Sequence, residues 1–72
     1  MTEDLRDLAE FALPYSRKAE LREYTYDSGM KMLRLVLREG KRITQVDVDA
    51  EIARAMAAEM LAWADAQSGE QS

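Results

Sequence analysis

Residues 30–48, MKMLRLVLREGKRITQVDV, constrain the fold most, because they have the pattern of a β-hairpin. Leu33, Leu35 and Leu37 occupy alternate positions, and glycines lie on both sides of the run. Leucine, methionine and arginine also favour helices, so a helix is the competing interpretation. The period of two favours a strand.

The turn of this hairpin is predicted at Glu39 and Gly40. A two-residue turn there places Val36 opposite Ile43 and separates the side chains into two faces, whereas a three-residue turn would mix them. The inner face is then predicted to hold Leu33, Leu35, Leu37, Thr44, Val46 and Val48.

Residues 19–26 are predicted to form the strand before the hairpin, followed by a turn at residues 27–29. Two registers are open. A three-residue turn places Tyr24 opposite Met32, with Tyr24 and Tyr26 on the outer face. A two-residue turn places Glu23 opposite Arg34, with both tyrosines inside. Neither is free of mismatches, and we favour the first.

Helices are predicted at both ends of the chain. Thr2 can cap the first, and Leu5, Leu8, Ala9 and Ala12 follow at the spacing of one helical face, with Pro14 ending the helix.

Asp49 is predicted to cap the second helix, over residues 50–66. Ile52, Met56, Met60 and Trp63 give it an apolar face, with Trp63 expected in the core.

The fold class predicted from these elements is α+β, as one domain over residues 1–67. It comprises a short N-terminal helix, a three-stranded antiparallel β-meander and a long C-terminal helix packed on the sheet. Residues 68–72 are expected to be a disordered tail.

Size and composition favour association with a second copy. A chain of 72 residues buries only about 60% of its unfolded surface, and this one has no cysteine or histidine for a disulfide or zinc staple. We therefore expect a homodimer. The N-terminus lacks the pattern of a signal peptide and no apolar run is long enough to span a membrane, so a cytoplasmic location is the default expectation.

Charge is unevenly distributed within a net charge of −4. Residues 17–42 carry eight basic and four acidic side chains, whereas residues 43–72 carry one basic and six acidic side chains. Residues 1–16 are acidic as well, with four acidic side chains and one basic side chain. The two acidic ends make nucleic-acid binding an unfavoured alternative.

No motif for catalysis or cofactor binding is present, so we expect no enzyme activity, no cofactor and no metal. Asp47 and Asp49 could share a hard cation, but a helix cap beside a solvated edge charge explains them better.

The outer face of the sheet is the predicted functional surface, because it mixes apolar, aromatic and arginine side chains. Either the predicted N-terminal helix or another chain would cover it. We predict a non-catalytic interaction or accessory module, acting as a homodimer and contacting an unidentified protein partner. The alternative is a binder of single-stranded nucleic acid. The candidate surface comprises Tyr24, Tyr26, Met32, Arg34, Val36, Arg38 and Ile43.

Overall fold

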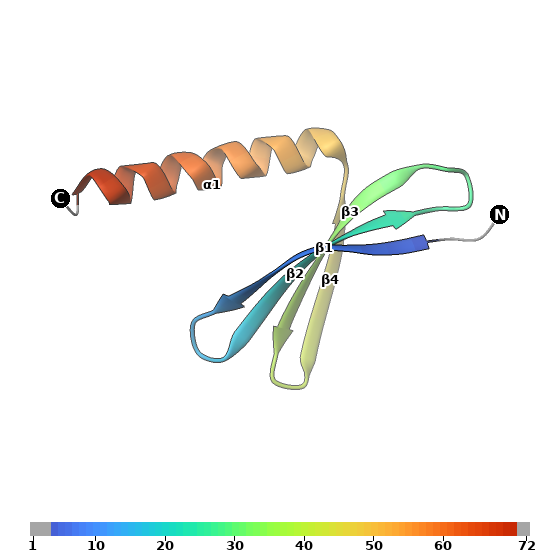
Figure 1. The fold of residues 1–72 in the computed structure, drawn as a ribbon, viewed down its shortest axis with the longest axis horizontal. Helices are drawn as coiled ribbons and strands as arrows, with labels where there is room; N and C mark the ends of the chain where they lie inside the picture. Colours follow the sequence, from blue (N-terminus) through green and yellow to red (C-terminus); the bar gives the residue numbers. More distant parts are fainter. Residues whose placement is uncertain (1–3, 71–72) are drawn as a thin grey trace.

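The fold is a four-stranded antiparallel sheet followed by one helix (Figure 1). The computed structural model describes residues 4–70, with side chains described through residue 67. The strands β1 (Asp4–Leu13), β2 (Arg17–Thr25), β3 (Lys31–Glu39) and β4 (Arg42–Val48) pair in sequence order, and α1 (Ala50–Glu70) follows. The prediction of an N-terminal helix and a three-stranded meander was therefore wrong. The predicted cap Thr2 lies outside the described residues.

A β-bulge in β1 explains why this strand has the sequence pattern of a helix. The register with β2 shifts between Asp7 and Ala9, so Leu8 is an extra residue. An extra residue interrupts the alternation of a strand. Leu5 consequently lies opposite Tyr24 on one face, whereas Ala9 lies opposite Leu21 on the other. The helix-like spacing of apolar residues arises from two strand segments of opposite phase.

The turn between β1 and β2 has an unusual backbone. Tyr15 and Ser16 both have positive φ angles, 64° and 61°, a conformation that costs L-residues roughly 1–2 kcal/mol each. Pro14, predicted to end a helix, instead leads into this turn from β1. The guanidinium of Arg17 lies 5.7 Å from the centroid of the Tyr15 ring.

Of the two registers left open for β2 and β3, the structure has the one that we favoured, with Tyr24 opposite Met32. The Tyr26 amide donates a hydrogen bond to the Met30 carbonyl at 2.9 Å, and the Gly29 amide donates to the Tyr26 carbonyl at 2.8 Å. Gly29 has a φ of 93°, which glycine adopts readily. The three-residue turn predicted here is confirmed.

The turn between β3 and β4 lies one residue later than predicted. Glu39 pairs with Arg42, and Gly40 and Lys41 form the loop. Gly40 has a φ of 60°, and glycine with positive φ at the first loop position is the signature of a type II′ turn. The predicted turn would have put Glu39 at that position. The pairing shifts by two residues, so Leu35 faces Val46 rather than Thr44, but the side chains keep their predicted faces.

The register divides the sheet into two faces, which we call the polar face and the apolar face. The polar face carries Leu5, Asp7, Glu10, Ala12, Lys18, Glu20, Arg22, Tyr24, Met32, Arg34, Val36, Arg38, Ile43, Gln45 and Asp47. The apolar face carries Ala9, Phe11, Leu13, Ala19, Leu21, Leu33, Leu35, Leu37, Val46 and Val48, together with polar and charged side chains mainly toward its ends: Asp4, Arg6, Arg17, Glu23, Thr25, Lys31, Glu39, Arg42 and Thr44.

Asp49 alone connects β4 to α1 and caps the helix as predicted. The Ile52 amide donates to Asp49 Oδ1 at 2.8 Å, and the Ala53 amide donates to the Asp49 carbonyl at 2.9 Å. These bonds satisfy donors that the first turn of a helix otherwise leaves free. The helix continues past the predicted end at Ala66 to Glu70, and residues 71–72 of the predicted tail lie outside the described residues.

The helix does not pack along the sheet, so that part of the predicted fold was also wrong. Figure 1 shows α1 extending from the end of β4, separate from the strands for most of its length, and its main contact is with β3. Trp63, predicted to be in the core, is 69% exposed. Among the described residues, Val36 on the polar face is the one fully buried apolar side chain, at 1% exposure.

Replacing Asp49 with alanine should lower the free energy of unfolding by about 1 kcal/mol, because the side-chain cap of α1 is lost. Far-UV circular dichroism should show reduced helicity in the same variant. Asp49→Asn is the matched control, since asparagine caps equally well. Equal stability of Asp49→Ala and the wild type at one protein concentration would show that the cap does not hold the helix start.

Candidate functional site

The polar face contains a cluster of two tyrosines, an arginine and an aspartate. Arg34 on β3 donates two hydrogen bonds to Asp47 on β4, from Nε to Oδ1 at 2.8 Å and from Nη2 to Oδ2 at 3.0 Å. The Tyr26 hydroxyl donates to Asp47 Oδ2 at 2.8 Å. The Arg34 guanidinium also lies 4.2 Å from the centroid of the Tyr24 ring. Tyr24 and Tyr26 meet edge to face with centroids 4.8 Å apart.

These hydrogen bonds fix the charge states within the cluster. The bonds from Arg34, with a smaller contribution from Tyr26, lower the pKa of Asp47 although its partial burial opposes the shift. The hydrogen bond to Asp47 raises the pKa of Tyr26, because the hydroxyl must keep its proton to donate. The cluster is therefore an ionised aspartate held by a permanent cation and a neutral phenol.

A second ion-pair group centres on Glu20, which is only 8% exposed. Arg38 Nε donates to Glu20 Oε2 at 3.0 Å, and this bond is the main reason why the pKa of Glu20 is lowered. Arg22 lies 3.0 Å from both Glu20 and Asp7. These contacts are ion pairs without good alignment, since Arg22 Nε and Glu20 Oε1 find no hydrogen-bond partner among the described residues.

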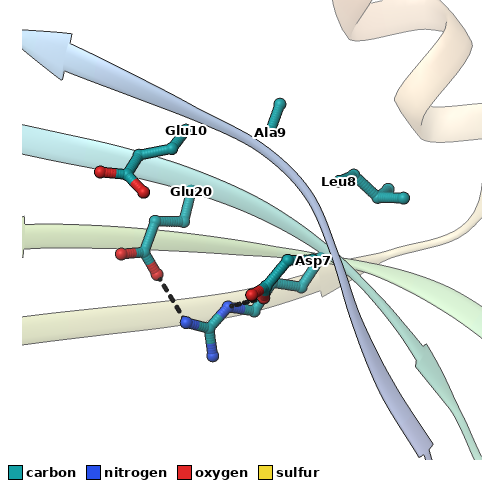
Figure 2. A pocket seen from close by; sticks show the side chains of 6 residues that line it. Asp7, Leu8, Ala9, Glu10 and Glu20 are labelled. Carbon is teal, nitrogen blue, oxygen red and sulfur yellow. Dashed lines mark ion pairs between the residues drawn. The ribbon is translucent and has the colours of Figure 1, made fainter.

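An open hollow lies beside this group, at the bulge of β1 (Figure 2). Figure 2 shows the carboxylates of Glu10, Glu20 and Asp7 on one side of the β1 ribbon and the side chains of Leu8 and Ala9 on the other. The bulge thus places Leu8 with the apolar face. The carboxylates in the hollow are engaged by basic side chains, including Lys18, which lies 3.0 Å from Glu10.

The structure brings all seven residues of the predicted functional surface to the polar face. Their exposure differs. Val36 is buried, and Arg34 and Arg38 are hydrogen-bonded to carboxylates. Val36 lies between the two arginines on the same face of β3, opposite Glu20 on β2 and Gln45 on β4. Ile43 is 51% exposed and is the most accessible apolar member.

The apolar face is the surface that sequence reasoning assigned to the core under the C-terminal helix. Without that cover it is open to solvent. Phe11 on β1 and Val46 on β4 are half-exposed, at 51% and 50%. Leu8, Leu13 and Leu37 are exposed as well. The alternation of the hairpin located this face correctly, but no pattern in the sequence states what covers it.

The helix carries a second unpartnered apolar surface, which we call the α1 stripe and define as Ile52, Met56, Met60 and Trp63. All four side chains are exposed, as is the neighbouring Leu61. Their spacing places them along one side of the helix. A single chain therefore exposes two apolar surfaces, one on the sheet and one on the helix, and surfaces of these two kinds can pack against each other as layers.

Asp47 and Asp49 do not form a shared cation site. The Asp47 carboxylate is held by Arg34 and Tyr26, whereas Asp49 caps α1. Over residues 4–67 no group of three or more His, Cys, Asp or Glu side chains could hold a metal ion. No helix in the described part of the chain has the length and apolar character needed to cross a membrane.

The Arg34–Asp47 pair predicts an acid-dependent loss of stability. Because the pKa of Asp47 is lowered in the folded chain, the unfolded chain binds more protons near the ordinary pKa of about 3.9. The stabilisation is present at neutral pH and is lost as the pH falls from about 5 through the folded-state pKa. We call this loss of stability with falling pH the acid limb. Asp47→Asn should make the acid limb less steep, and it should lower the free energy of unfolding at pH 7 by about 1 kcal/mol.

Denaturant titrations across this pH range measure both effects. Asp27→Asn is the matched control, because Asp27 is exposed in a turn and takes part in none of the ion pairs of residues 4–67. It should keep the acid limb of the wild type. An Asp47→Asn variant with an unchanged acid limb would show that this pair does not stabilise the fold.

No curated protein and no solved structure matches the chain. A protein-family model does match, over residues 2–66, which include the four strands and most of α1. The chain therefore belongs to DUF6967, a family of unknown function.

Proposed function

We propose that this chain is a small non-catalytic interaction module that acts as a homodimer. The observation that carries the proposal is the exposure of both the apolar face and the α1 stripe in a single chain. Apolar surface is driven out of water by the hydrophobic effect, in proportion to its area. Large contiguous exposed patches of this kind mark association surfaces.

The exposed area supports an extensive interface. A compact monomer of 8.2 kDa exposes about 4,500 Å², whereas this chain exposes 5961 Å². The excess is about 1,500 Å² per chain, compared with roughly 800 Å² per partner in a standard protein interface. If both chains of a dimer buried this excess, the total buried area would lie in the range of obligate homodimer interfaces.

The polar face is proposed for contact with a further protein partner rather than for the dimer. Its arginines form ion pairs with carboxylates of the same chain, so they do not require acidic side chains from a second copy. Ile43 and the half-buried Met32 add apolar surface beside Tyr24, whose ring packs against Arg34 and Tyr26. A cytoplasmic location is part of the same proposal.

Binding of single-stranded nucleic acid stays a prediction that the geometry does not favour. Of the four arginines on which this prediction rests, Arg22, Arg34 and Arg38 each pair with a carboxylate, so their charge is neutralised within the sheet. The fourth, Arg42, takes part in none of the ion pairs of the described residues. Phosphate contacts would give affinity that falls steeply with salt. Such a slope with single-stranded RNA would favour this alternative over the interaction module.

Light scattering on the purified chain tests the proposed homodimer. We expect twice the chain mass of 8.2 kDa at micromolar concentration. Val46→Lys should abolish this dimer or the fold that depends on it, because it places a charge on the apolar face. Gln45→Lys is the matched control, since Gln45 is the preceding residue on β4, is exposed and lies on the polar face.

The control variant should keep the dimer mass and the wild-type circular dichroism spectrum. A wild-type chain that is folded and monomeric at all accessible concentrations would overturn the proposal. So would a folded, dimeric Val46→Lys variant.

A further inference from the structure

We propose that the dimer forms by exchange of α1, with the helix of each chain lying across the apolar face of its partner's sheet. This inference rests on the proposed homodimer and adds its mode of assembly. The occupant of the apolar face is thus the α1 stripe of a second copy.

The connection between β4 and α1 directs the helix away from its own sheet. Asp49 is the single linking residue, and both its side chain and its carbonyl accept hydrogen bonds from the first turn of the helix. With this short connection, α1 contacts its own sheet mainly at β3 and projects beyond it for most of its length (Figure 1). The α1 stripe is therefore placed where it can reach the sheet of another chain.

The dimensions and the chemistry of the two surfaces match. A helix of 21 residues is roughly 31 Å long, about the length of a nine-residue strand such as β3. The α1 stripe extends over three turns with Met56 and Met60 at its centre, and methionine adapts to irregular apolar surfaces. The face it would cover is lined by leucine, valine and phenylalanine. A helix on one side of an antiparallel sheet is a stable layer arrangement.

The charges are complementary as well. From Ala50 to Glu70, the helix carries four acidic side chains and Arg54 as its one basic side chain. Of the basic side chains in residues 4–49, those without an ion pair are Lys31, Lys41 and Arg42. Lys31 and Arg42 occupy positions of the apolar face at opposite ends of the sheet, opposite Thr25 and Glu39. The same ends also carry Asp4 and Glu23 near Lys31 and Glu39 beside Arg42, so an acidic helix crossing that face would meet one basic side chain without an ion pair at each end.

The absence of native cysteine allows a site-specific cross-linking test. Met60→Cys labels the α1 stripe, and Leu35→Cys labels the centre of the apolar face, where it pairs with Leu21 and Val46. The Met60→Cys chain is prepared with ¹⁵N, mixed with the unlabelled Leu35→Cys chain, unfolded, refolded together and treated with a flexible bismaleimide. Each chain holds one cysteine, so every cross-link joins two chains, and mass spectrometry identifies which.

The control is a mixture of Met60→Cys and Gln45→Cys chains, because Gln45 lies on the polar face. Helix exchange predicts that the mixed Met60–Leu35 cross-link is several-fold more abundant than the mixed Met60–Gln45 cross-link. Light scattering is recorded on the same refolded mixtures. A dimer in which Met60–Met60 or Leu35–Leu35 links dominate would overturn helix exchange but leave the homodimer standing. A monomeric mass without cross-links would overturn both.

Discussion

The proposed assembly depends on the apolar face of the sheet, which a single chain leaves exposed to water. A sheet with one hydrophobic face needs a second layer, and the chain supplies a candidate layer in α1. That helix follows β4 after the single residue Asp49 and projects away from the sheet to which it is attached (Figure 1). The apolar face of the sheet and the α1 stripe are both exposed as a result. Association with a second copy is the arrangement that would satisfy both surfaces with the chain's own residues.

The polar face shows how the sheet holds its register while its other side is uncovered. Basic side chains reach across neighbouring strands at each step of the meander: Lys18 to Glu10, Arg38 to Glu20, and Arg34 to Asp47. Cross-strand pairs of opposite charge contribute roughly 0.2–1 kcal/mol each. Their chief effect is to specify which residues lie opposite one another, because a slip by one residue would separate them. Val36 lies among these pairs, so the buried apolar side chain is found on the face with the most charge.

The sequence predicted those parts of the fold that depend on local pattern. Alternation along β3 and β4 located both faces of the hairpin, and the position of Asp49 located the start of the helix. The N-terminal strand was missed because the bulge at Leu8 produces a helix-like spacing. The predicted position of the β3–β4 turn was one residue too early. The first loop position needs a positive φ, which glycine adopts readily, and this places Gly40 rather than Glu39 there. The candidate surface was gathered correctly on one face, but its arginine–carboxylate pairing depends on contacts between strands that no single segment reveals.

The claim that the apolar face is an association surface is tested most directly by unfolding the chain at several protein concentrations. A folded dimer in equilibrium with unfolded monomers has a thermal and denaturant midpoint that rises with total concentration. Our account predicts such a rise for the wild-type chain, by about 1.4 kcal/mol in the apparent stability of folding for each tenfold increase in concentration. A sharp, cooperative transition with the same midpoint across a hundredfold range would show that the single chain is stable with its apolar face exposed, and would contradict the account.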